Sequence, residues 1–123
     1  MDKVLLQKKR RFRLDPNNPY RTRYMVYSLV DAGRGKYVIE VEQYDYVLRS
    51  QVAAEVFATP ELSNPASGKQ LVEYMLEHAK NKADIIDIYH EWRQGQIPLI
   101  REGRNVLVKE ALRRRFARNL KKL

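Results

Sequence analysis

The 123-residue sequence contains no cysteine. This absence excludes a disulfide-stabilised scaffold, thiol catalysis, thiolate-bound zinc and iron–sulfur clusters. Histidine is scarce as well, with two residues in the whole chain, and no nucleophile, base and acid can be grouped around them. We therefore assign no catalytic residue, no metal ligand and no cofactor.

Long apolar runs are also missing. No stretch approaches the roughly 18 to 20 apolar residues that a membrane-spanning helix needs, and the N-terminal segment lacks the apolar centre of a secretory signal. Hydrophobic residues nevertheless make up 44% of the chain, which is enough for one globular core. We expect a cytoplasmic or otherwise intracellular protein with no membrane partner.

Acidic residues are few at both ends of the chain. Residues 1–23 have a net charge of +6 and residues 101–123 have +7, whereas residues 24–100 have −4 within the total of +9. Because like charges concentrated in short segments attract a polyanion, this distribution indicates that the ends, and not the acidic middle, make the functional contacts.

The clearest secondary structure is a β-hairpin. Residues 20–30 and 37–42 alternate apolar and polar side chains, and the glycine-containing segment 31–36 separates them. This pattern predicts two antiparallel strands with one apolar face, from which Glu40 and Glu42 point toward water. Residues 1–19 precede the hairpin as a basic arm or an edge strand, and residues 20–123 form the single domain.

Helical patterns dominate the rest of the chain. The four-residue spacing of Leu48, Val52 and Val56 predicts a helix over residues 46–58, and residues 59–68 are typical of a loop. One long helix or two shorter helices are expected over residues 71–92.

The C-terminal part is expected to begin with an extended segment over residues 96–108 and to end in a helix over residues 108–123. That last helix has an apolar stripe through Leu112, Phe116 and Leu120 and a basic outer face. The expected fold class is therefore α+β: a hairpin or a small antiparallel sheet packed against two to four helices, with an amphipathic, basic C-terminal helix.

The basic residues lead to a functional hypothesis. Lysine and arginine neutralise phosphates and release condensed counterions, so we expect non-catalytic binding of DNA or RNA. An acidic protein partner is the alternative, with the apolar C-terminal stripe supporting assembly into a homo-oligomer. The candidate phosphate contacts are Lys8, Lys9, Arg10, Arg11, Arg13, Arg21, Arg23, Arg113, Arg114, Arg115, Arg118, Lys121 and Lys122.

Tyrosine is abundant, with eight residues, and four of them lie in the hairpin region. We interpret Tyr20, Tyr24, Tyr27 and Tyr37 mainly as strand residues whose rings pack and whose hydroxyl groups stay wet. Stacking of exposed rings on unpaired bases, next to arginine, is the alternative interpretation.

One enzymatic alternative comes from the acidic residues of the hairpin, Asp31, Glu40 and Glu42. Their arrangement resembles the core of the restriction-endonuclease-like nucleases, in which an acidic residue and an acidic-x-lysine tripeptide on paired strands hold Mg²⁺. Glu42 stands where that family has its lysine. The resemblance implies a divergent Mg²⁺-dependent nuclease, which we rank below the two binding hypotheses.

Overall fold

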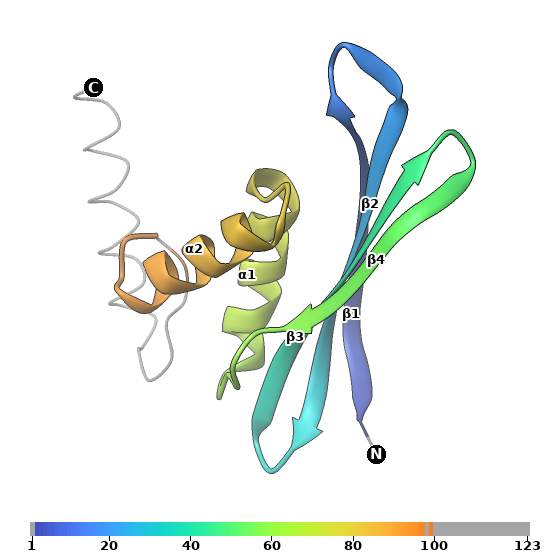
Figure 1. Ribbon diagram of the computed structural model, residues 1–123. Coiled ribbons are helices and arrows are strands. Elements are labelled where there is room, and N and C mark those ends of the chain that lie inside the picture. The colour runs from blue at the N-terminus through green and yellow to red at the C-terminus, as the bar shows by residue number, and fades with distance from the viewer. Residues whose placement is uncertain (1, 98, 100–123) are drawn as a thin grey trace, which may run out of the picture.

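The computed structural model describes residues 2–97 and 99 (Figure 1). In this part of the chain, four antiparallel strands form one sheet in the order β1-β2-β3-β4, and two helices follow them. The α+β class and the small antiparallel sheet expected from the sequence are confirmed. The elements are β1 (Lys3–Asp15), β2 (Asn18–Gly33), β3 (Lys36–Val47), β4 (Ser50–Ala58), α1 (Pro65–His78) and α2 (Lys82–Arg93).

Tight turns join the four strands. Arg34 and Gly35, in the turn between β2 and β3, have φ angles of 57° and 71°, and positive φ at both central positions is the requirement of a type I′ hairpin turn. Leu48, between β3 and β4, also has a positive φ of 56°. Short turns of this kind keep neighbouring strands in register over long lengths, so all four strands form one meander.

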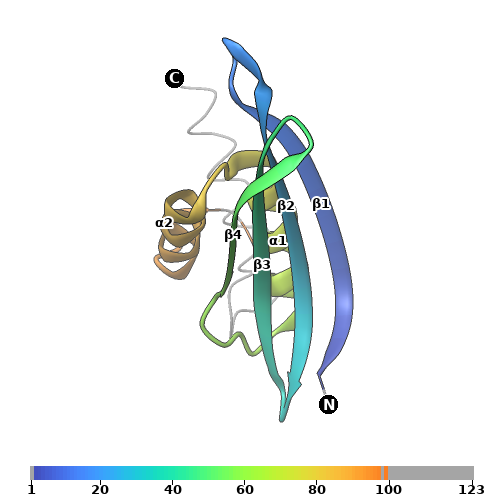
Figure 2. The ribbon, with the colours of Figure 1, turned by 45° about the vertical axis from the view of Figure 1, so that its right-hand side comes forward.

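Both helices lie on one side of the sheet (Figures 1 and 2). The hydrophobic core lies between them and the central strands β2 and β3, because alternate residues of these strands point toward the helices. The inward face predicted for the hairpin is confirmed, whereas β2 is buried on both of its faces from Met25 to Val30. The core includes Met25, Tyr27, Leu29, Ile39, Val41, Leu62, Leu71, Val72, Met75, Ile85, Ile88 and Trp92.

Asparagine residues set the starts of both helices. The Asn64 side chain accepts a hydrogen bond from the backbone N–H of Ala66, and the Asn81 side chain accepts one from Asp84. Such N-caps satisfy backbone donors that the first turn leaves without a partner. Residues 71–92 therefore contain two helices, as one alternative predicted. The expected loop over 59–68 is wrong for residues 65–68, which form the first turn of α1.

The predicted helix over residues 46–58 is wrong, because this segment contains the end of β3 and all of β4. Asp45, the residue before the predicted helix, lies within β3, and its carboxylate binds Arg23 of β2 at 2.7 Å. Residues 50–58 instead pair with β3, with Phe57 opposite Val41. The four-residue spacing of valines was compatible with either structure, and pairing with the free edge of the hairpin selected the strand.

The N-terminal basic segment is the strand β1 at one edge of the sheet, as one of its two interpretations proposed. The expected boundary between residues 19 and 20 falls inside β2. The predicted C-terminal helix over 108–123 and most of the predicted extended segment over 96–108 lie outside the described residues. Neither α1 nor α2, the helices of the described part, is long and apolar enough to cross a membrane.

Candidate nucleic-acid interface

The basic residues of β1 are divided between the two faces of the sheet. Arg10 lies opposite the core residue Met25, so Arg10 and the alternating residue Lys8 are on the side of the helices. Arg11 lies opposite Tyr24 and therefore points to the other side of the sheet. Lys9 and Arg13, two residues before and after Arg11, point to the same side. We call this second side, which neither α1 nor α2 covers, the open face.

Two of the predicted phosphate contacts are engaged within the protein. Arg10 donates to the carbonyl oxygens of Leu76 and Glu77 at 2.8 and 3.0 Å, and a cation at these positions is favoured by the dipole of α1. Arg23 binds both carboxylate oxygens of Asp45, and this hydrogen-bonded carboxylate raises the pKa of Arg23. Because both guanidinium groups hold the fold together, they are poorly placed to bind a ligand.

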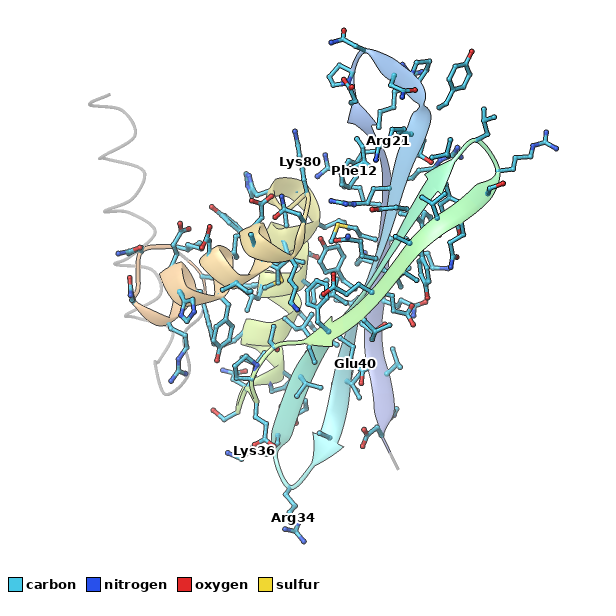
Figure 3. The ribbon with its side chains drawn as sticks, in the orientation of Figure 1. Phe12, Arg21, Arg34, Lys36, Glu40 and Lys80 are labelled. Carbon is cyan, nitrogen blue, oxygen red and sulfur yellow. The ribbon has the colours of Figure 1, made fainter. Side chains whose placement is uncertain are left out.

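The other predicted cations are spread along the molecule. Arg21 is exposed and lies at the end of the sheet where Phe12 and Lys80 also lie (Figure 3). Another exposed arginine, Arg34, lies at the opposite end, in the turn between β2 and β3 (Figure 3). The predicted contacts of the C-terminal helix, Arg113, Arg114, Arg115, Arg118, Lys121 and Lys122, lie outside the described residues.

The open face is built of rows of side chains that run across the four strands. One row contains Arg13, Thr22, Tyr46 and Gln51, and the next contains Arg11, Tyr24, Tyr44 and Ala54. These two rows, at the end of the sheet with the β1–β2 and β3–β4 turns, combine arginine with tyrosine and contain no carboxylate.

The following rows of the open face have a different charge. The first of these rows contains Lys9 and Glu42, and the second contains Gln7 and Glu40. The face is therefore electrostatically divided along the strands, with cations at one end and carboxylates toward the other.

The two arginine- and tyrosine-containing rows border a hollow with a volume of about 320 Å³, close to the lower end of the range for small-ligand sites. We call it the tyrosine–arginine hollow. Among the described residues, its lining contains two phenol rings, two guanidinium groups, a threonine hydroxyl and a leucine side chain, and no carboxylate. The lining residues are Arg11, Thr22, Tyr24, Tyr46, Leu48 and Arg49.

Leu48 at the rim of this hollow combines exposure with an unusual backbone. Its side chain is 65% exposed, although leucine is normally among the most buried residue types. Its positive φ of 56° is a conformation that favours glycine or asparagine. A hydrogen bond of 2.7 Å from its N–H to the carbonyl oxygen of Tyr20 holds the turn against β2.

The three carboxylates of the nuclease alternative do not form one site. Glu40 and Glu42 are on the open face, whereas Asp31 lies opposite Tyr37 on the helix side. The Asp31 side chain accepts a hydrogen bond from the N–H of Gly33 within its own turn. Among residues 2–97 and 99, no group of three or more potential metal ligands is close enough to hold an ion.

The sequence analysis gave no functional role to three residues at this end of the open face: Tyr44 and Tyr46 of the two rows, and Arg49 of the β3–β4 turn. The alternation of residues 37–42 continues through Tyr44 and Tyr46, and this signal predicts a longer β3, in conflict with the helix pattern over residues 46–58. Arg49 follows Leu48 in the β3–β4 turn, a position where the sequence pattern predicted a helix. Of the tyrosines of the predicted hairpin, Tyr27 is a core residue and Tyr24 is on the open face.

Comparison of the chain with protein-family models, curated proteins and solved structures found no match. The functional interpretation therefore depends on the chemistry of the surface alone.

Proposed function

We propose that this protein binds nucleic acid without catalysis, and that the open face of the sheet contacts the phosphates. The observation that carries the proposal is the set Lys9, Arg11 and Arg13. These cations occupy alternate positions of one strand, so they lie roughly 7 Å apart in a line and point to the side that α1 and α2 leave uncovered. None of them forms an ion pair within the described residues.

A line of free cations suits a repeating polyanion better than a single anion. Each phosphate that a lysine or arginine neutralises releases condensed counterions, and this gain does not depend on sequence. Such contacts position a protein on nucleic acid without reading its bases. The six cations predicted for the C-terminal helix would add further phosphate contacts of the same kind.

The test is the salt dependence of binding to fluorescent DNA and RNA probes, measured by anisotropy. The triple variant Lys9→Gln/Arg11→Gln/Arg13→Gln should bind more weakly, and its slope of log affinity against log salt should fall by about 2 on single strands or 2.7 on duplex, because each lost contact accounts for about 0.7 or 0.9. Circular dichroism and thermal melting check that the variant is folded.

The double variant Arg34→Gln/Lys36→Gln is the matched control, since it removes exposed cations from the far end of the sheet (Figure 3). Its slope should stay closer to that of the wild type. If the wild type binds no nucleic acid at low salt, or if the triple variant keeps the full slope, the proposal is wrong.

A second candidate function, self-assembly, is favoured by the edge strand β4. Val52 and Val56 are 59% and 66% exposed, and the one charged side chain of β4, Glu55, is paired with Lys82 at 3.0 Å. Two β4 edges can therefore meet without charge repulsion, whereas two cationic β1 edges cannot. We therefore expect β4 to pair with the β4 strand of a second copy of this chain. The oligomeric state of the Val56→Lys variant tests this.

A further inference from the structure

We propose that the tyrosine–arginine hollow binds unpaired bases of a single-stranded nucleic acid. Bases would stack on the rings of Tyr24 and Tyr46, and Arg11 and Arg49 would hold the neighbouring phosphates. This inference rests on the proposed function and makes it more specific, because it names the strandedness of the ligand and the residues that determine it.

The chemistry of the hollow matches a nucleotide. A nucleotide has a flat apolar base next to a charged phosphate, and the hollow places two phenol rings beside two guanidinium groups. Base–aromatic stacking is tolerant of sequence because every base has a π-face. The carboxylates of the open face, Glu40 and Glu42, lie outside the lining of the hollow, so the groups that would surround a bound phosphate include two guanidinium groups and neither of these carboxylates.

The same geometry disfavours a duplex. Bases in a duplex are stacked on each other and paired, so a tyrosine on a sheet can reach the π-face of a base only when the base is unpaired. Tyr24 and Tyr46 are on adjacent strands and in adjacent rows, which allows two different bases of one strand to be stacked. A duplex would be left with the phosphate contacts alone.

The strained turn at Leu48 gives independent support. A leucine with a φ of 56° and 65% exposure lowers the stability of the protein without a ligand. Asparagine tolerates this backbone conformation better. Within the hollow, this side chain extends the apolar wall that a base would contact. Leu48→Asn should therefore leave thermal stability equal or higher while weakening binding to a single strand.

The decisive experiment compares three probes at one salt concentration: oligo-dT, oligo-rU and a mixed-sequence DNA duplex, each about 12 nucleotides or base pairs long, within the known range of site sizes. The wild type should prefer at least one single-stranded probe. Tyr24→Leu and Tyr46→Leu should each weaken that binding about fivefold or more, with an unchanged salt slope because no charge is lost. Tyr24→Phe and Tyr46→Phe keep the ring and should bind within about twofold of the wild type.

Tyr74→Leu is the matched control, since Tyr74 lies on α1, on the other side of the sheet from the hollow. It should not change binding. If the duplex binds as well as both single strands, or if the leucine variants bind normally, the inference is wrong while the proposed function stands. If none of the three probes binds, the proposed function itself fails.

Discussion

Tyr24 and Tyr27 lie three residues apart on β2 and have opposite environments. Tyr24 lines the tyrosine–arginine hollow on the open face, whereas Tyr27 is 1% exposed and packs in the core. Burial disfavours the charged phenolate, and this raises the pKa of Tyr27 from 10.0 to about 12. One tyrosine is thus available to a ligand, and the other makes the fold sensitive to alkali.

The sensitivity of Tyr27 gives a prediction about stability and pH. The folded state keeps the Tyr27 proton up to a pH of about 12, whereas the unfolded chain loses it near 10. The stabilisation is therefore complete below pH 10 and is lost as the pH rises toward 12. In urea unfolding across this range, the wild type should lose stability relative to Tyr27→Phe. The slopes of the unfolding free energy against pH should differ by the equivalent of up to one proton released on unfolding. Parallel pH profiles for the two proteins would contradict this.

Arginine residues show why a sequence cannot fully define the interface. All five cations of residues 8–13 were equivalent candidates, because basic side chains on a strand look alike before the sheet is oriented. Pairing with β2 then placed Arg10 beside the end of α1 and Arg11 on the open face. The alternation was readable from the sequence, but which of its two faces the helices would cover was not.

At the scale of elements, α1 packs closely against β2 at Gly68. A Cβ atom added to this residue would lie 2.5 Å from Cδ1 of Leu29. Leu29 is completely buried, so its side chain has little room to move away. The absence of a side chain at Gly68 is thus what allows the helix to pack on β2.

Gly68→Ala should therefore destabilise the protein. Alanine favours a helix over glycine by about 1 kcal/mol, whereas forcing extra atoms into a packed core costs about 1–3 kcal/mol. We expect a net loss of up to about 2 kcal/mol in the free energy of unfolding. Thermal and urea denaturation measure it. Lys69→Ala, on the exposed side of the same turn, should change little.

A second substitution tests the cause of that loss. Leu29→Val removes part of the side chain that a Cβ at position 68 would meet, so it should recover stability in the Gly68→Ala background and lose stability alone. Additive effects of the two substitutions would show that the close approach is not the reason for the glycine.

The sequence predicted the elements that have one consistent pattern. The β2–β3 hairpin, its inward face and the helical character of residues 71–92 follow from alternation and helical spacing. The prediction for residues 46–58 failed because their apolar spacing fits both a helix and a strand. Only the unpaired edge of β3 distinguishes the two structures. The hollow depends on this segment, since Tyr46 enters it from the end of β3 and Leu48 and Arg49 enter it from the β3–β4 turn.

At the scale of the whole molecule, the two edges of the sheet differ in character. The edge strand β1 carries lysine and arginine, which discourage pairing with another strand, whereas β4 carries exposed valines and a neutralised Glu55. Antiparallel pairing of two β4 edges about a two-fold axis would keep the helices of both copies on one side. The two open faces would then form one continuous surface.

We predict that the wild type forms a dimer through β4, detected as a concentration-dependent sedimentation coefficient. Val56→Lys places a charge at a position that is 66% exposed, so it should shift the equilibrium to the monomer without unfolding the chain. Val4→Lys makes the same change at a 53% exposed position of β1, and it should leave the dimer intact. A wild type that stays monomeric at every concentration, or two variants that sediment alike, would exclude this edge as an interface. In that case β4 contributes to function only by holding the β3–β4 turn at the hollow.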